Sequence, residues 1–184
     1  MLARKIAACS LAIALAASAG AAPGPGLPRM LQSRGPIDHQ AHGGELLARH
    51  NVERQQAGVA PLVWDPALAT GARAYANELA RRNLFRHSPK AGRPGQGENL
   101  WMGTRDYFRP TRMVADWASE RSMFRAAQFP QVSKTGNWAD VGHYTQMIWP
   151  DTKRVGCAIS KAAQNDVLVC RYWPAGNVVG VRVP

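Results

Sequence analysis

The chain has 184 residues, of which 46% are hydrophobic and 19% charged, so its composition excludes a fully disordered protein. Its length suits one domain with appendages rather than two domains. The formal net charge of +11 is consistent with attraction to anionic surfaces such as cell envelopes or acidic polysaccharide, or with a solvated basic surface on an exported protein. The basic residues are scattered, however, and no helix-turn-helix, zinc-finger or RNA-binding signature is present, so we expect no nucleic-acid partner.

Residues 1–21 have the layout of a secretory signal peptide. Arg4 and Lys5 precede an apolar run from Ile6 to about Ala17, and small residues offer cleavage sites up to Ala21. The run is too short and too rich in alanine for a comfortable membrane span, and no later segment is long enough for one. Removal of this segment lowers the formal charge from +11 to +9, because it carries only these two basic residues and no acid. We therefore expect a secreted protein, in the periplasm or the extracellular medium.

Residues 22–42 are rich in proline and glycine and lack apolar periodicity, which predicts a flexible leader. His39 and His42 in this segment offer a possible metal contact, although histidines in such a segment are more often solvated. The folded domain is predicted to cover residues 43–184.

Two helices open the predicted domain. The first begins near Gly43 and is stopped by Gly58. An extended link, Pro61 to Trp64, leads to a second helix from Asp65 to about Arg82. Aspartate at its N-cap followed by proline is a favourable start, and apolar residues follow at helical spacing: Leu68, Ala72, Tyr75, Ala76 and Leu79.

Residues 83–102 contain several glycines and prolines and are predicted to be a loop. An irregular stretch of this length inside a compact domain is usually functional or disordered, and this one carries His87 and Glu98. Thr111 is predicted to cap a further helix, which presents Met113, Val114, Trp117 and Phe124 on one side. Glu120 lies three residues after Trp117 and close to the same face.

The second half of the domain has β patterns. Residues 141–149 are predicted to be a strand that carries His143, Thr145, Met147 and Trp149 on one face. Two further strands, residues 155–160 and 167–173, flank a turn. Because helices come first and strands mostly later, the pattern predicts an α+β fold.

A hairpin centred between residues 163 and 164 places Cys157 opposite Cys170. Opposed residues on antiparallel strands come close enough for a disulfide, and an exported chain meets oxidising conditions. The sequence therefore predicts a Cys157–Cys170 disulfide, with a buried pair of free thiols as the alternative.

Four short segments together resemble the CAP superfamily, which comprises cysteine-rich secretory proteins, antigen 5 and plant pathogenesis-related 1 proteins. They are Arg86-His87-Ser88-Pro89, Gly97-Glu98-Asn99-Leu100, Trp117-Ala118-Ser119-Glu120 and Gly142-His143-Tyr144-Thr145-Gln146. The end of the chain, Cys170-Arg171-Tyr172-Trp173-Pro174-Ala175-Gly176-Asn177, fits the same pattern. The resemblance covers roughly residues 45–180.

The resemblance implies a three-layer α-β-α sandwich with a central antiparallel sheet. It also implies a surface cleft lined by two histidines and two glutamates, which by motif position are His87, Glu98, Glu120 and His143. Family members bind divalent ions such as zinc or magnesium through the two histidines. The extra cysteines of the larger eukaryotic members are missing here, and Phe124 stands where many relatives have a tyrosine.

This tetrad permits several interpretations. Neutral imidazoles are good zinc ligands, and neighbouring carboxylates orient them. Two histidines predict a weakly bound ion, because catalytic zinc sites usually have three protein ligands. A satisfied polar network without any ligand is the structural alternative.

The favoured function is a secreted binding or defence-type module with a divalent-metal cleft; whether it is an enzyme is left open, with turnover not expected. A metal-dependent hydrolase with Glu98 or Glu120 as the base is the second hypothesis. A triad using Ser88 or Ser119 is conceivable but lacks a nucleophile-elbow pattern. The ligand is expected to be a lipid, a glycan or a protein.

Lipid or sterol carriage is the third hypothesis, through apolar surface near residues 146–149. Trp101 and Tyr107, in sequence predicted to be loop-like, are candidates for lining a lipid or glycan groove, although large aromatic residues mostly serve packing. Trp149 is predicted to lie in the core. Residues 174–184 are predicted to form a C-terminal strand and tail.

Overall fold

The computed structural model describes residues 42–184. The predicted signal peptide and the leader up to residue 41 lie outside the described residues. The helices are α1 (Gly43–Gln56), α2 (Pro66–Arg82), α3 (Pro110–Ser119) and α4 (Gly142–Met147), with short 3₁₀ helices η1 (Lys90–Gly92), η2 (Glu120–Ser122) and η3 (Trp138–Val141). The strands are β1 (Val63–Trp64), β2 (Gly97–Thr104), β3 (Ala127–Gln128), β4 (Arg154–Lys161), β5 (Asn165–Trp173) and β6 (Arg182–Val183).

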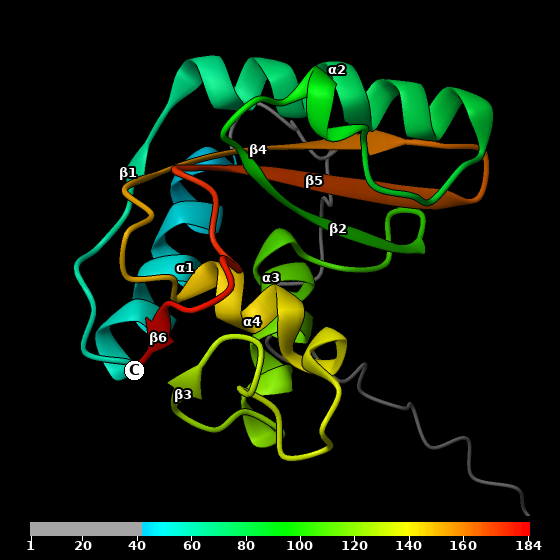
Figure 1. Ribbon diagram of the computed structural model, residues 1–184. Helices are drawn as coiled ribbons and strands as arrows, with labels where there is room; N and C mark the ends of the chain where they lie inside the picture. Colours follow the sequence, from blue (N-terminus) through cyan, green and yellow to red (C-terminus); the bar gives the residue numbers. More distant parts are fainter. Residues whose placement is uncertain (1–41) are drawn as a thin grey trace, which may run out of the picture. The chain divides into compact units, whose positions relative to one another are not determined.

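A four-stranded sheet with the strand order β1-β4-β5-β2 forms the middle layer. The pairs β2–β5 and β4–β5 are antiparallel, whereas the short β1 joins β4 in parallel. Helix α2 covers one face of this sheet, and α1, α3 and α4 lie on the other side (Figure 1). The predicted α+β sandwich is therefore confirmed, with the parallel β1 pairing as an addition.

Helix α2 forms as its sequence predicts. The Asp65 side chain accepts hydrogen bonds from the backbone N–H groups of Ala67 and Leu68 at the start of the helix. Its buried face packs closely on β4, because a Cβ added at Gly156 would lie 2.2 Å from the backbone nitrogen of Ala69. Any larger residue at position 156 would push this helix away from the sheet.

The larger core lies between the sheet and the layer of α1, α3 and α4. Its members include Leu46, Met113, Val114, Trp117, Met147, Ile148, Trp149, Ile159, Leu168 and Tyr172. Burial of these side chains supplies the main driving force for holding that layer on the sheet. The expected core position of Trp149 is confirmed.

The β4–β5 hairpin has the predicted register. Cys157 is the direct partner of Cys170, and a disulfide joins them. The C-terminal strand is also present: β6 pairs with β3 in a separate two-stranded sheet.

The predicted strand over residues 141–149 is wrong, because this segment forms η3 and α4. Both ends of α4 are capped from distant parts of the chain. Glu120 accepts hydrogen bonds from the backbone N–H groups of His143 and Tyr144, and Arg54 donates to the carbonyl oxygens of Met147 and Trp149. A six-residue helix needs such partners for its free terminal groups, and a local pattern cannot reveal them.

The predicted loop over residues 83–102 is partly wrong, because its end belongs to β2. This strand pairs with β5 along its whole length, although it contains two glycines. Gly97 has no room for a side chain, since a Cβ there would lie 2.0 Å from Oε1 of Gln146. Tertiary packing thus explains the glycine at position 97, although a glycine inside a strand is locally unfavourable.

The predicted cap of the third helix is also wrong. Helix α3 begins at Pro110, after the N-cap residue Arg109, so that Thr111 lies inside the helix. Phe124 lies beyond its end, and its ring contacts Tyr144. None of the helices within residues 42–184 combines the length and the apolar character that crossing a membrane requires.

Candidate functional site

A cleft of about 710 Å³ opens at β2, which is an edge strand of the four-stranded sheet. It is lined by residues of β2, by the segment that follows α2, by η3 and α4, and by residues 175–178. Three members of the predicted tetrad, His87, Glu98 and His143, contribute to this lining. The fourth, Glu120, lies behind His143 and does not line the cleft.

The first histidine–glutamate pair joins the segment after α2 to β2. Nδ1 of His87 lies 2.7 Å from Oε1 of Glu98. The His87 side chain is 55% exposed, whereas that of Glu98 is fully buried. A carboxylate can only accept, so Nδ1 carries the proton of this hydrogen bond, and Nε2 lies on the side of the ring away from Glu98.

Glu98 receives further support from two neighbours. The backbone N–H and the hydroxyl of Ser88 both donate to its carboxylate, each at 2.9 Å. The Arg171 guanidinium lies 3.1 Å from Oε2, from the partner position on β5. Burial by itself would raise the pKa of Glu98, but the bond to His87, the charge of Arg171 and the Ser88 donors hold it below its ordinary value.

The second pair joins η2 to α4. Nδ1 of His143 lies 2.6 Å from Oε1 of Glu120, whose other oxygen accepts the backbone N–H groups of His143 and Tyr144. The imidazole also stacks on the indole of Trp117, with the ring planes 12° apart. This ring orientation is thus fixed from two sides, and Nε2 again faces away from the carboxylate.

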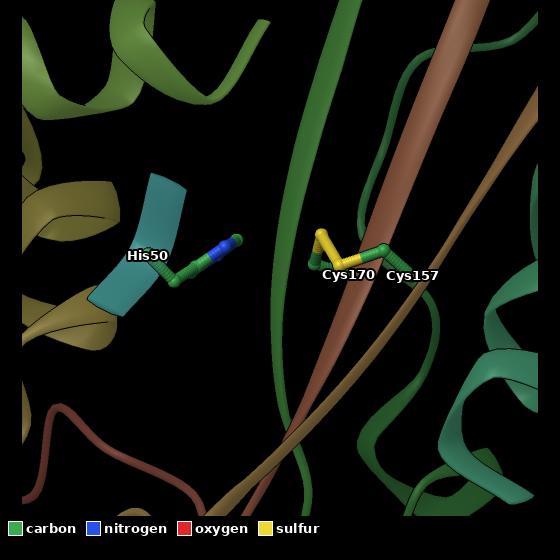
Figure 2. Close-up of side chains that lie close together, drawn as sticks. All are labelled: His50, Cys157 and Cys170. Atoms are coloured by element: carbon green, nitrogen blue, oxygen red, sulfur yellow. A yellow bond between two sulfur atoms is a disulfide. The ribbon is translucent and has the colours of Figure 1, made fainter. Parts of the chain in front are cut away.

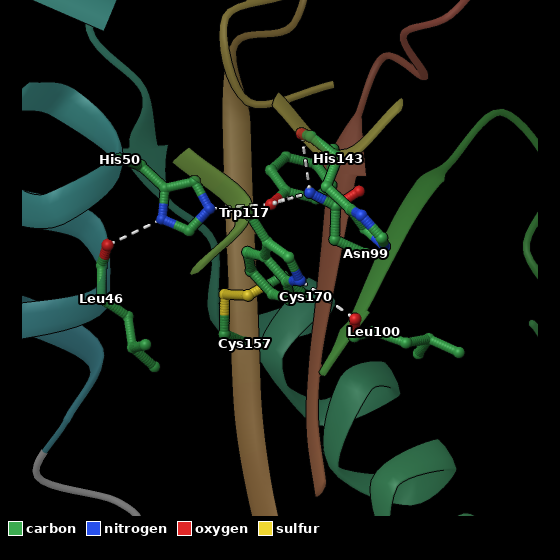
Figure 3. Close-up of a disulfide and its surroundings, with 9 residues drawn as sticks. Leu46, His50, Asn99, Leu100, Trp117, His143, Cys157 and Cys170 are labelled. Atoms are coloured by element: carbon green, nitrogen blue, oxygen red, sulfur yellow. Dashed lines mark hydrogen bonds between the residues drawn. A yellow bond between two sulfur atoms is a disulfide. The ribbon is translucent and has the colours of Figure 1, made fainter. Parts of the chain in front are cut away.

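A buried polar chain leads from this pair into the core (Figure 3). Asn99 donates to the backbone oxygen of His143 and to the hydroxyl of Tyr172. That hydroxyl lies 2.7 Å from Nε2 of His50, whose Nδ1 donates to the Leu46 carbonyl. Burial lowers the pKa of His50 to about 4, so its ring is neutral and accepts the Tyr172 proton.

His50 also lies beside the two cysteines (Figure 2). Its ring nitrogen and both sulfur atoms fall within 4.8 Å of one another, and within residues 42–184 this is the one group of three or more potential metal ligands. The sulfurs are joined in the disulfide and have no thiolate to offer. Both nitrogens of His50 are hydrogen-bonded as well, so we interpret the group as core packing.

The structure does not support the roles that the sequence suggested for two serines and for Trp101. The Ser88 hydroxyl donates to Glu98 and that of Ser119 to the Asp116 carbonyl, so neither serine has a histidine partner among the described residues. Trp101 is buried on β2 and donates to Asp116, contrary to its expected loop position in a groove.

The expected apolar surface near residues 146–149 is wrong, because all four of these residues are buried. Tyr107 is exposed but lies away from the cleft lining, as does Phe124.

Sequence reasoning missed Arg171, although a signal for it exists. Glu98 and Arg171 are direct partners in the β2–β5 register, and both point toward the α2 side, where Arg171 lies over the ring of Tyr75. Pairing the Gly97-Glu98-Asn99 segment with Cys170-Arg171-Tyr172 would have placed the two charges together. The cleft residues Lys90, Arg93 and Trp138 carried no comparable signal.

Comparison with known proteins decides the family. The family model described as "CAP: Cysteine-rich secretory protein family" matches residues 47–172. The chain belongs to the CAP family. This CAP protein is 36% identical over 151 residues to pathogenesis-related protein 1B of Nicotiana tabacum, covering 78% of this chain and 84% of that protein. It is 37% identical over 139 residues to Golgi-associated plant pathogenesis-related protein 1 of Homo sapiens, covering 73% and 84%.

Solved structures show the same fold. The crystal structure of NaASP2 with Zn²⁺ matches with a TM-score of 0.67 and 23% identity, covering 80% of this CAP protein and 88% of that chain. The structure of BmVAL-1 matches with a TM-score of 0.64 and 22% identity, covering 77% and 81%.

Proposed function

We propose that this CAP protein is a secreted binding module whose cleft holds a divalent cation, zinc or magnesium, through His87 and His143. One observation carries the proposal. Both imidazoles belong to the same cleft, and each is bonded through Nδ1 to a glutamate. Within residues 42–184 neither Nε2 atom has a hydrogen-bond partner, so both lone pairs remain for a ligand.

The donor set fits such an ion. Neutral imidazole nitrogen suits zinc, and a carboxylate behind the ring raises its basicity and fixes its orientation. Two protein ligands leave positions for water or for groups of a bound partner, so the affinity is expected to be modest. The ion would supply positive charge at the floor of the cleft, while the chain supplies the orientation of both rings.

Hydrolysis is a weaker candidate. Glu98 is fully buried and already accepts from His87 and Ser88, and Glu120 accepts from His143 and two backbone groups. A general base must reach the proton that it removes. Neither carboxylate has that access, which favours a binding module over an enzyme.

Calorimetric titration with Zn²⁺ tests the proposal. We expect one weak site in the wild type and its loss in the double variant His87→Ala/His143→Ala. The control His39→Ala/His42→Ala also removes two histidines, but outside the cleft, one from the predicted leader and one from the N-cap of α1, and should keep the site. Unchanged zinc affinity in the cleft variant would contradict the proposal, and loss in the control alone would move the site to the leader.

A further inference from the structure

The wall of the cleft carries an exposed tryptophan. Trp138 is 44% exposed and lines the cleft, whereas Trp101, Trp117 and Trp149 are buried in the core. An indole of this size gains from losing its contact with water. Its exposed ring is therefore a platform on which a ligand can stack.

This platform is held rigidly. Trp138 opens η3, whose cap residue Asn137 accepts the backbone N–H of Ala139. The ring packs edge-on against Phe129, and a Cβ at Gly142 would come within 3.2 Å of it. A fixed ring loses little conformational entropy when a ligand covers it.

The charge of the cleft is positive. Lys90 and Arg93 line it. The Arg93 side chain donates to the backbone oxygens of Ser88 and Gln96, whereas the Lys90 side chain has no ion-pair or hydrogen-bond partner within residues 42–184. Glu98 is the one carboxylate in the lining, and the guanidinium groups of Arg171 and Arg93 already compensate its charge, at 3.1 and 3.9 Å. An anionic group entering the cleft thus meets the unpaired amine of Lys90 and no accessible acid.

Several of the residues that line the cleft are small. Gly95, Gly97, Gly142, Ala175 and Gly176 belong to the lining. A Cβ at Gly176 would lie 2.7 Å from the Trp149 ring, so the backbone there must stay bare.

We propose that the cleft binds an acidic oligosaccharide, with a sugar ring stacked on Trp138 and a carboxylate directed at Lys90. The inference deepens the proposed binding cleft and rests on it. A pyranose ring has an apolar face of C–H groups, and a uronic acid adds a carboxylate; together they match an aromatic platform beside an unpaired amine. A peptide rich in acidic residues offers the charge but no such ring.

A tetrasaccharide of galacturonic acid is the probe, and its fully methyl-esterified form is the uncharged control of the same shape. Calorimetry should show binding of the acid that weakens with salt, and at least roughly tenfold weaker binding of the ester. Equal binding of acid and ester would overturn the inference, as would tighter binding of tetraglutamate than of the saccharide.

Matched variants locate the site. Trp138→Ala should weaken binding roughly tenfold, whereas Trp173→Ala, which removes a tryptophan that is 41% exposed outside the cleft, should not. Lys90→Gln should weaken it about three- to fivefold, and Lys153→Gln, at an exposed site elsewhere, should leave it unchanged. Equal losses in the control variants would overturn the inference.

Two further measurements allow the metal site and the saccharide site to be tested separately. Circular dichroism checks that each variant is folded. Lys90→Gln changes an exposed side chain that has no partner within residues 42–184, so it tests the inference even if Trp138→Ala is unstable. Zinc titration of the same samples reports the metal site independently. If zinc binding is intact but no saccharide binds, the acidic-oligosaccharide inference is wrong and the proposed metal site stands.

Discussion

The two histidine–glutamate pairs of the cleft are built in different ways. Glu98 is fully buried and depends on a guanidinium and a serine, whereas Glu120 is partly exposed and accepts backbone N–H groups at the start of α4. His87 is 55% exposed and is oriented by its carboxylate alone; His143 is 34% exposed and also stacks on Trp117. The His87–Glu98 pair is thus stabilised by charge compensation of its glutamate, and the His143–Glu120 pair by hydrogen bonds from the backbone.

The largest expected effect comes from breaking the charge-compensated pair. Glu98→Ala leaves Arg171 buried without its carboxylate, which should lower the free energy of unfolding by about 3–5 kcal/mol. Urea denaturation at neutral pH measures it. The control Glu78→Ala breaks an exposed pair with Arg82 and should cost less than about 1 kcal/mol. A similar small loss in both variants would show that the buried pair does not carry this energy.

An effect of about 3 kcal/mol is expected from the buried histidine behind the second pair. The pKa of His50 is about 4 in the folded chain against 6.5 when exposed, so the unfolded chain binds a proton that the folded one excludes. Its contribution to stability is complete above pH 6.5 and is lost as the pH falls toward 4. Urea denaturation across this range should show the decline, and His50→Gln should remove it. An unchanged slope in the variant would assign the decline to other groups.

The smallest effect is expected from breaking the backbone-held pair. Glu120→Ala removes the acceptor of two N–H groups and of one imidazole, which should cost about 2 kcal/mol. Because Trp117 still holds the His143 ring, zinc affinity should fall less than in Glu98→Ala. Denaturation and zinc titration of the two variants side by side measure both differences. A larger loss of affinity in Glu120→Ala would reverse the proposed ranking of the pairs.

A structural feature could be predicted from the sequence when the residues that fix it are close together along the chain. Helix α2 was predictable because its cap, its first proline and its apolar spacing are all neighbours in sequence. The Cys157–Cys170 pairing was predictable because a short turn fixes the hairpin register. The two histidines and two glutamates were named from motifs, and the structure places each histidine on a glutamate.

The two failed predictions of secondary structure, for residues 141–149 and 97–104, share one cause. Residues 142–147 have a strand-like pattern, yet Glu120 and Arg54 cap both ends of a helix there. Residues 97–104 look irregular because of their glycines, yet pairing with β5 makes them a strand. In each case partners more than 20 residues away decide the backbone conformation, and local propensity is overridden.

The sequence by itself determined helix α2 with its own cap, the cysteine hairpin and the identity of the residues available for a site. Only the tertiary structure decided that β2 lies at the sheet edge, that Arg171 neutralises Glu98, and that Lys90 and Trp138 stand in the same cleft as the histidines. The physical reason is that turns and caps are satisfied between near neighbours. A charge or a hydrogen-bonding group that leaves water is satisfied by whatever the fold brings to it, however far away along the chain.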